Sequence, residues 1–452
     1  MTKVIVIGAG LAGSEAANFL ANRNIQVILI EGKKVQRNPS QKIDTYAELV
    51  CTNSLKSMRE DSGHGLLKVE MDKLGSIILD AGRQHAVPAG DALAVDRDNF
   101  SAEVTKRLHG HENITVVEEH ATDPNELILK YEAEACIVAT GPLTSEGLSN
   151  WIQKEISNDD FYFYDAIAPV VDADSLDYSK LYFKDRHKPV SEEEGLEADY
   201  LNAPMNKEQY EDFIKELVES KKVPAQNFED YKFFESCLPV DIMAERGVDT
   251  ARFSCMKPIG LEMPDGTLPY ACVQLRKENL LGSAFNLVGF QTRLTYGEQV
   301  RVFQKIPGFE NASFLHLGSV HRNSFLNSRT LLNNDLSSKK YPNIYFAGQI
   351  TGVEGYTESA AMGLYVAAQL YKKIKGEQVK PWPVECGMGA LVNYIMTVPK
   401  PTPSNINFGL LPQVTLTKEQ RRDRKNRKRY KKEIASQRAR EAFENFMKDY
   451  LV

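Results

Sequence analysis

The hydrophobic pattern at the start of the chain predicts a strand, a turn, a helix and a second strand in close succession. Apolar runs cover residues 4–7 and 25–30, and both are short and uninterrupted. Such runs are typical of strands buried on both faces of a parallel sheet. The alanine-rich stretch 14–21 between them predicts the crossover helix. Residues 4–31 therefore predict a parallel βαβ unit.

Similar apolar runs and a similar helical stretch occur twice more, later in the chain. Residues 135–139 and 343–347 are apolar runs that end in small residues, and residues 355–370 form a helical stretch rich in small residues. The middle differs, because residues 208–220 show an amphipathic helical pattern and residues 269–276 predict a strand. We therefore expect an α/β fold in which a Rossmann-like domain is interrupted by an inserted α+β domain.

The changes of pattern also predict the domain boundaries. The nucleotide-binding domain would comprise residues 1–150 and 341–412, the insertion residues 151–340, and a basic helical tail residues 413–452.

Local patterns give four further expectations. The apolar spacing predicts one helix over residues 65–81, and strands over residues 127–131 and 287–292. The basic tail is polar nearly all round until Phe443 and Phe446, so we expect a solvated helix there.

The turn after the first strand has glycine where a bound dinucleotide would require it. Gly8 permits a tight turn, Gly10 lets the backbone approach a pyrophosphate, and Gly13 lets the helix pack close to the sheet. The helix N-terminus directs unpaired N–H groups at phosphates. Glu31 ends the second strand, where a carboxylate can accept hydrogen bonds from ribose hydroxyls. The predicted site comprises Gly8, Ala9, Gly10, Leu11, Ala12, Gly13 and Glu31.

Composition narrows the class of protein. At 452 residues the chain is too long for one compact core, and it contains no apolar window of membrane-spanning length. The six cysteines include no CxxC pair, so neither a zinc site nor a disulfide framework is expected. We predict no metal site, no membrane association and a cytoplasmic location.

Charge is unevenly distributed along the chain. The formal net charge is −6, yet twelve Lys or Arg and only three Asp or Glu lie between Lys418 and Arg440. Such asymmetry suggests contact with nucleic acid at a particular surface. A solvated helix is the other interpretation of the same charge run, and the sequence leaves both open.

Several long motifs resemble a single family. They are the opening glycine motif, Glu48-Leu-Val-Cys51-Thr-Asn-Ser, Cys237-Leu-Pro, Met243-Ala-Glu-Arg-Gly, Met256-Lys-Pro-Ile-Gly-Leu, Gln274-Leu-Arg, Val288-Gly-Phe-Gln-Thr, Phe346-Ala-Gly-Gln-Ile-Thr-Gly-Val-Glu-Gly-Tyr and Asn407-Phe-Gly. From residue 1 to about residue 412 the chain resembles the folate- and FAD-dependent RNA (uracil-C5-)-methyltransferases, the TrmFO family. It is more distantly similar to the glucose-inhibited division protein A flavoproteins, which share a glutathione-reductase-like FAD scaffold and modify wobble uridines.

The resemblance implies formation of 5-methyluridine in structured RNA. Methylenetetrahydrofolate would donate the carbon, and reduced FAD would serve as reductant and methylene carrier. NAD(P)H would reduce the flavin from a transient site, because the sequence has no second complete GxGxxG motif. Most members act on uridine 54 of the tRNA T-loop and some on a 23S rRNA uridine; we expect tRNA on family frequency alone. No obligate protein partner is inferred.

Two cysteines lie inside the resembling motifs and suit the chemistry. Carbon 5 of uracil becomes nucleophilic once a thiolate adds to carbon 6, and a thiolate both attacks and leaves well. We predict Cys51 as nucleophile or flavin-facing thiol, and Cys237 as its partner in proton transfer or the alternative nucleophile. The alternative for each is a buried, inert thiol. Cys136, Cys255, Cys272 and Cys386 are expected to pack.

The remaining site predictions concern folate, flavin and RNA. His321 is the candidate for stacking on the pterin, and Gly348, Thr351 and Gly352 should meet the flavin or its diphosphate. Phosphate contacts call for Lys and Arg. The candidates are Lys257, Arg276, Arg424, Lys425 and Arg427. The target base must be extruded from its loop before it can react.

Three other functions remain open at this stage. The opening motif alone would allow an NAD(P)H-dependent flavin oxidoreductase acting on a small molecule. The other two functions are those of a wobble-uridine modifying flavoprotein and of an RNA-binding protein that keeps FAD without catalysis.

Overall fold

The computed structural model describes most of the chain. The described residues are 2–38, 40–157, 162–166, 168–186, 198–223, 238–278, 282–318, 320–399, 403–423 and 425–450, with backbone only at residues 162–166, 320–324, 428 and 449.

A five-stranded parallel sheet organises the first part of the fold. Its order is β16 (Ile344–Phe346), β7 (Ala135–Val138), β1 (Lys3–Ile7), β2 (Gln26–Ile30) and β6 (Ile114–Val117). The chain leaves this sheet after β7 and returns as β16 at its edge. The predicted α/β class, with an interrupted nucleotide-binding sheet, is therefore confirmed.

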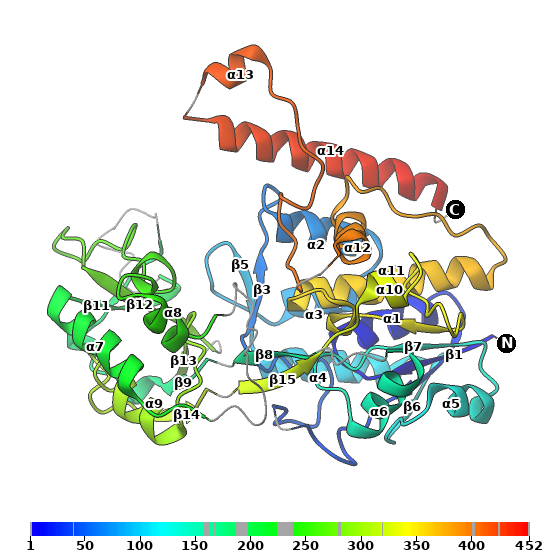
Figure 1. Cartoon of the computed structure of the whole chain (residues 1–452), viewed down its shortest axis with the longest axis horizontal. Helices are drawn as coiled ribbons and strands as arrows, with labels where there is room; N and C mark the ends of the chain where they lie inside the picture. The colour runs from blue at the N-terminus through cyan, green and yellow to red at the C-terminus, as the bar shows by residue number, and fades with distance from the viewer. Residues whose placement is uncertain are drawn as a thin grey trace.

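Small residues let two helices approach closely on this sheet (Figure 1). Helix α1 (Leu11–Ala21) packs against α11 (Tyr356–Ile374). A Cβ added to Gly363 would lie 2.1 Å from the carbonyl oxygen of Ala12, and one added to Gly13 would lie 1.8 Å from that of Gly8. No larger residue fits either position, which explains why this region is rich in Gly and Ala.

Two local predictions in this part are wrong. Residues 65–81 form two helices, α2 (Gly63–Lys73) and α3 (Ile77–Gln84), because Gly75 has φ +80° and the Ser76 side chain caps α3 by accepting from the Leu79 N–H. Residues 127–131 belong to a helix, α5 (Pro124–Tyr131), rather than a strand. Asp123 caps it, and Pro at the start of a helix is favoured.

Other elements complete this part. The further helices are α4 (Arg97–Gly110), α6 (Glu146–Glu155), α10 (Ser328–Leu331) and α12 (Gly387–Thr397), and a small sheet has the order β3 (Ser54–Ser57), β5 (Ala92–Val95), β4 (Ala86–Val87).

A six-stranded sheet forms the second part. Its order is β10 (Tyr182–Phe183), β11 (Tyr200–Met205), β12 (Ala271–Lys277), β13 (Ala284–Leu287), β9 (Val170–Asp172) and β14 (Phe314–His316), and every pairing is antiparallel. The strand predicted over residues 287–292 is wrong in extent, because β13 ends at Leu287 and Gly289 turns the chain with φ +78°.

Helices α7 (Lys207–Glu219), α8 (Val240–Arg246) and α9 (Tyr296–Phe303) accompany this sheet. The predicted inward face of α7 is confirmed: Tyr210, Phe213, Ile214 and Leu217 are buried. A ribbon of β8 (Tyr162–Ala166) and β15 (Val320–Ser324) lies between the two parts (Figure 1).

The basic tail differs from the expectation of a fully solvated helix. It contains α13 (Lys418–Arg422) and α14 (Arg427–Tyr450), and α14 lies along α2 (Figure 1). One face of α14 is buried at Ala439 and Phe443. The Trp382 ring lies 5.8 Å from Phe443 and 5.7 Å from Phe446, between ring centroids. Apolar residues spaced one helical turn apart anchor the helix, while its first turns remain exposed. No helix among the described residues has the length and apolar character needed to cross a membrane.

Candidate active site

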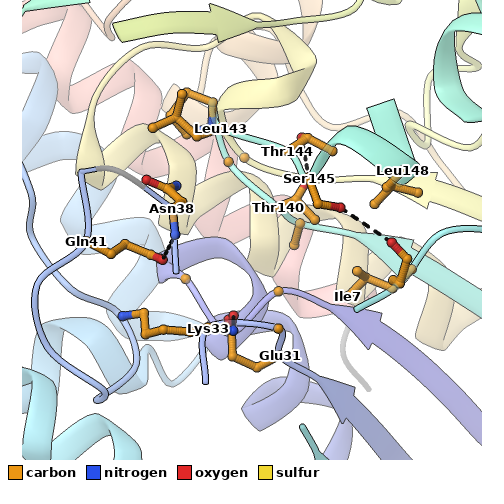
Figure 2. A pocket seen from close by; sticks show the side chains of 18 of the residues that line it. Ile7, Glu31, Lys33, Asn38, Gln41, Thr140, Leu143, Thr144, Ser145 and Leu148 are labelled. Atoms are coloured by element: carbon orange, nitrogen blue, oxygen red, sulfur yellow. Dashed lines mark hydrogen bonds between the residues drawn. The ribbon is translucent and has the colours of Figure 1, made fainter. Parts of the chain in front are cut away.

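A cavity of about 920 Å³ opens at the carboxyl ends of the parallel strands. It is lined by the ends of β1 and β2 at Ile7 and Glu31, by the turn from Gly8 to Ala12, and by the turn after β7 (Figure 2). Ligands of open α/β sheets bind at this edge, where the strand order reverses. Here the reversal falls at β1, because β2 and β7 lie on its two sides.

The three glycines of the turn have distinct geometries. Gly8 has φ +97°, and a Cβ there would lie 2.8 Å from the Ala139 carbonyl oxygen. Gly13 is blocked by the Gly8 carbonyl, whereas a Cβ on Gly10 would meet no atom within 4 Å. Gly10 therefore leaves open space beside the cavity at the N-terminus of α1. That space suits a phosphate group close to backbone N–H groups.

The carboxylate of Glu31 is held at the end of β2. Its Oε2 accepts from the Ala9 N–H at 2.7 Å and its Oε1 from the Lys33 N–H at 2.9 Å. His120 also lines the cavity, and its buried Nε2 has no hydrogen-bond partner within the described part of the chain. A carboxylate for ribose hydroxyls and an unpaired ring nitrogen both fit the adenosine end of a dinucleotide.

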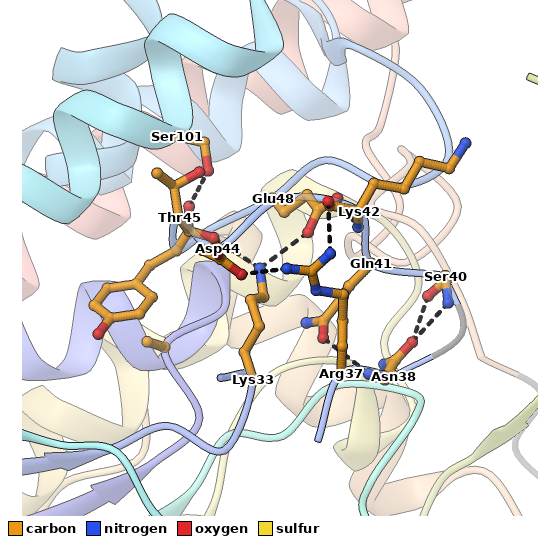
Figure 3. A network of polar contacts seen from close by, with 12 residues as sticks. Lys33, Arg37, Asn38, Ser40, Gln41, Lys42, Asp44, Thr45, Glu48 and Ser101 are labelled. Carbon is orange, nitrogen blue, oxygen red and sulfur yellow. Dashed lines mark hydrogen bonds and ion pairs between the residues drawn. The ribbon is translucent and has the colours of Figure 1, made fainter. Parts of the chain in front are cut away.

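A polar network shapes the loop that covers one side of the cavity (Figure 3). Lys33 and Glu48 form an ion pair of 2.9 Å, and both side chains are at most 9% exposed. Lys33 Nζ also donates to the Thr45 carbonyl at 2.7 Å. Arg37 pairs with Asp44 and donates to the Lys42 carbonyl at 2.8 Å. This network could not be predicted from the sequence, because its partners lie in an irregular loop that carries no periodic pattern.

Small residues line the opposite side of the cavity. The turn after β7 includes Thr140 and Thr144, whose hydroxyls lie 2.7 Å apart (Figure 2). The predicted small-residue turn at residues 140–142 therefore lies at the cavity.

Cys51 lies at the cavity, next to Val50 and Tyr356. Its backbone N–H donates to the Tyr356 hydroxyl oxygen at 2.6 Å, and that of Thr52 donates to the same oxygen at 3.2 Å. Burial raises the pKa of Tyr356, so the phenol remains protonated. The first residue of α11 thus positions the Cys51 backbone. Cys237 lies outside the described residues.

The segment around Cys51 is also tied to the second sheet. The Arg276 guanidinium donates to the Thr52 hydroxyl, and the Asn53 amide donates to the Lys277 carbonyl at 2.9 Å. Arg97 donates to the Leu49 carbonyl at 2.9 Å and pairs with Glu278 at 2.7 Å. Arg276 and Lys277 therefore contact residues 52 and 53 directly, and Glu278 is linked to residue 49 through Arg97.

The other predicted cofactor residues divide into two groups. Gly348 lines the cavity, as do Leu11, Ala12 and Gln349. Thr351 is buried and donates its hydroxyl to the Gly348 carbonyl at 2.7 Å, and neither it nor Gly352 lines the cavity. His321 lies in β15, but its side chain is outside the described part of the structure.

The predicted RNA contacts differ in their exposure. Lys257, Lys425 and Arg427 are exposed, whereas Arg276 is only 7% exposed. Arg424 lies outside the described residues.

The remaining cysteines pack as predicted. Cys136, Cys272 and Cys386 are buried, and Cys255 is half-buried with its sulfur 3.9 Å from that of Met243. Burial raises the pKa of Cys255 and of Cys272 to about 12, so neither thiol ionises near neutral pH. Among the residues that the structure describes, no group of His, Cys, Asp and Glu could hold a metal ion.

Comparison with known proteins establishes the family. The profile described as Glucose inhibited division protein A matches residues 3–378. A protein of Enterococcus faecalis, named methylenetetrahydrofolate–tRNA-(uracil-5-)-methyltransferase TrmFO, is 47% identical over 94% of this chain and 95% of its own length. The chain belongs to the TrmFO branch of the glucose-inhibited division protein A family. The resemblance found in the sequence motifs is therefore confirmed.

Two further relatives support this assignment. A TrmFO protein of Streptococcus pneumoniae is 46% identical over 93% of this chain and 94% of its own length. The solved structure of GidA from Aquifex aeolicus aligns with a TM-score of 0.67 at 17% identity, covering 98% of this chain and 76% of GidA. The GidA structure supports the fold alone.

Proposed function

We propose that this protein methylates carbon 5 of a uridine in structured RNA, with methylenetetrahydrofolate as carbon donor. Uridine 54 of the tRNA T-loop is the favoured target. The observation that carries the proposal is the position of Cys51, a cysteine held through its backbone at a dinucleotide cavity. Relatives named as tRNA (uracil-5-)-methyltransferases, 46–47% identical over more than nine-tenths of the chain, support the reaction class.

The residues of the cavity suit FAD. Gly8 to Gly13 and the N-terminus of α1 would hold the diphosphate, Glu31 the ribose, and Gly348 the region near the flavin. When bound, reduced FAD supplies reducing equivalents and carries the one-carbon unit. We also propose that NAD(P)H reduces the FAD. His321 is the proposed residue for stacking on the pterin of the folate.

Cys51 and Cys237 carry the proposed chemistry on the RNA. A thiolate that adds to carbon 6 of uracil makes carbon 5 electron-rich, and the second cysteine serves in proton transfer. Which of the two attacks is open. Tyr356 accepts hydrogen bonds from two consecutive N–H groups, so the Cys51 backbone keeps one position while a base enters.

RNA binding would use charged groups beside the cavity and on the tail. We propose Lys257, Arg276, Arg424, Lys425 and Arg427 as contacts, residues 151–340 as the folate and substrate domain, and a cytoplasmic location. Phosphate contacts of this kind weaken as salt rises, because counterions are released on binding.

The test is transfer of labelled carbon. Purified protein is incubated with labelled methylenetetrahydrofolate, NADPH and either undermodified tRNA or 23S rRNA, and 5-methyluridine is located in each RNA. We expect label at tRNA uridine 54, and its loss in Cys51→Ala and Cys237→Ala. The matched control is Cys255→Ala, which changes a cysteine that does not line the cavity.

Three results would reject the proposal. They are label that enters only from S-adenosylmethionine, protein that takes up no FAD, and methylation that continues when both Cys51 and Cys237 are replaced. Label found only in 23S rRNA would keep the chemistry and change the substrate.

A further inference from the structure

The stretch of chain that ends at Cys51 is held at both of its ends by residues that line the cavity. At its start, the Thr45 carbonyl accepts from Lys33 Nζ at 2.7 Å. At its end, the Cys51 N–H donates to the Tyr356 hydroxyl oxygen at 2.6 Å. We call residues 45–51 the cavity segment. Two different parts of the cavity wall therefore fix where this segment begins and ends.

The two sides of the cavity segment have different surroundings. Tyr46 and Leu49 are 2% and 1% exposed and belong to the hydrophobic core. Glu48, Val50 and Cys51 line the cavity instead. Apolar packing therefore anchors one side of the segment. On the other side Glu48 is the single charged residue of the segment, and its contacts determine how the backbone before Cys51 is held.

Glu48 forms a buried ion pair with Lys33 (Figure 3). Lys33 Nζ lies 2.9 Å from Glu48 Oε2, and the two side chains are only 2% and 9% exposed. Glu48 Oε1 accepts from the Lys42 N–H at 2.7 Å. Charges removed from water must stay paired, because a charge left alone has neither solvent nor partner. The pair therefore opposes any movement of Glu48 away from Lys33.

Lys33 is itself held by residues that suit the cofactor. Its N–H donates to Glu31 Oε1 at 2.9 Å, and Glu31 Oε2 accepts from the Ala9 N–H at 2.7 Å. The Ala9 carbonyl in turn accepts from the Ala47 N–H at 2.9 Å. The glycine turn, the end of β2 and the cavity segment thus form one closed set of contacts. The ion pair is the charged link in that set.

We propose that Lys33 and Glu48 are positioning residues for Cys51. Their ion pair holds the cavity segment at a fixed place relative to Glu31 and the glycine turn, so the thiol keeps one position relative to a cofactor bound there. They act through the backbone of residues 48–51 and take no part in bond making. The proposal rests on the proposed function, in which Cys51 acts on uracil. Misplacing a reacting group by about 1 Å can lower a rate about a hundredfold.

Three variants test whether the two charges act as a pair. Lys33→Met leaves Glu48 without its cation, and Glu48→Gln leaves Lys33 without its anion. The double variant leaves no buried charge at all. Removing one partner of a buried ion pair is more disruptive than removing both. We therefore expect each single variant to loosen the cavity segment and the double variant to restore it.

Alkylation of Cys51 by iodoacetamide measures this loosening. The rate is followed on the Cys51 peptide by mass spectrometry, in the full chain with excess FAD. Because alkylation follows the population of locally open molecules, we expect each single variant to react at least about tenfold faster than wild type. The double variant should return to within about threefold of wild type.

Asp44→Asn is the matched control for these variants. Asp44 lies in the same loop and pairs with Arg37, but its side chain is 63% exposed. Exposed ion pairs contribute little to stability. The alkylation rate of Cys51 in Asp44→Asn should therefore equal that of wild type.

Methylation kinetics with excess FAD give a second readout. In the single variants we expect kcat to fall at least about a hundredfold, because the thiol is misplaced. The KM for RNA should change less than about threefold, since the contacts that bind RNA remain. The double variant should recover most of kcat. A residue needed only for binding RNA would raise KM and leave kcat unchanged.

Three results would overturn the inference. Unchanged alkylation of Cys51 in both single variants would show that apolar packing alone holds the segment. Equal loss of FAD affinity in Lys33→Met and in the double variant would show that Lys33 binds the cofactor directly. Faster alkylation of Cys255 in step with Cys51 would show a general loss of stability. Wild-type protein that makes no 5-methyluridine would instead reject the proposed function, and the alkylation rates do not depend on that activity.

Discussion

The two sheets of this protein obtain their stability in different ways. The parallel sheet and its helices meet through backbone contacts, and Gly13 and Gly363 are positions where no side chain fits. The antiparallel sheet is packed with large aromatic side chains. Phe303 lies 5.9 Å from Phe290 and 6.5 Å from Phe213, between ring centroids. A backbone contact demands one residue type, whereas an aromatic core accepts several arrangements.

This difference explains why a ligand-binding motif can be recognised in the sequence of only one of the two parts. Glycine positions, strand ends and a terminal carboxylate form a readable motif in the parallel sheet. The antiparallel sheet contributes to the same site through Arg276 and Lys277, which contact Thr52 and Asn53, 224 positions earlier in the chain. Glu278 pairs with Arg97, which is 181 positions earlier. The sequence gives no local sign of those contacts.

The largest expected effect is loss of the cofactor from the parallel part. Gly10→Val places a branched side chain into open space beside the cavity, so the fold should persist while a diphosphate is excluded. We expect FAD affinity to fall at least about a thousandfold, or about 4 kcal/mol. Flavin absorbance of the purified protein measures this, with thermal unfolding as the control. A yellow Gly10→Val protein would contradict the assignment of the turn.

A core substitution in the antiparallel part should lower stability and leave FAD binding unchanged. Phe303→Ala removes a fully buried ring that contacts three other Phe rings, and such changes cost about 3–5 kcal/mol. We expect a lower unfolding midpoint with FAD content per folded molecule unchanged. Denaturant titration followed by far-UV circular dichroism, which reports both parts, and by Trp fluorescence, which reports the parallel part where Trp151 and Trp382 lie, would separate the two parts. Loss of FAD in step with stability would show that they unfold as one unit.

The smallest effect is a pH dependence that belongs to the parallel part. Glu15 accepts from Ile77 and Ile78 at the start of α3, and Glu70 accepts from Met388 at the start of α12. Burial raises the pKa of both carboxyls to about 8. Because the folded state then binds more protons than the unfolded state, stability falls as pH rises from about 4.5 to about 8.

Thermal unfolding between about pH 5 and pH 9 measures this slope. Glu70→Gln should flatten it, because the amide does not titrate. An identical slope in wild type and Glu70→Gln would contradict the role of this carboxyl.

The limits of prediction from the sequence follow the same division. The parallel βαβ unit around Gly8 and the amphipathic face of α7 were predictable, because each depends on local spacing. The break between α2 and α3 was missed because a single Gly75-Ser76 step outweighs the apolar periodicity. The anchoring of α14 was missed because Trp382, its partner, lies far away in the sequence.

The site predictions show the same limit. Cys51 could be singled out from its motif, but its support by Tyr356 comes from a helix about 300 positions later. Arg276 was predicted as an RNA contact, and the sequence did not indicate that it is buried where β12 meets the Cys51 segment. Burial of a charged residue depends on which segments meet, and a pattern along the chain does not contain that information.

The interrupted sheet has a consequence for how the protein is made. The glycine turn is synthesised well before β16 and α11, which complete the cavity beside it. A nascent chain that ends before residue 346 still lacks the strand that covers β7. The turn therefore becomes part of a complete cavity only after the whole antiparallel part has been synthesised.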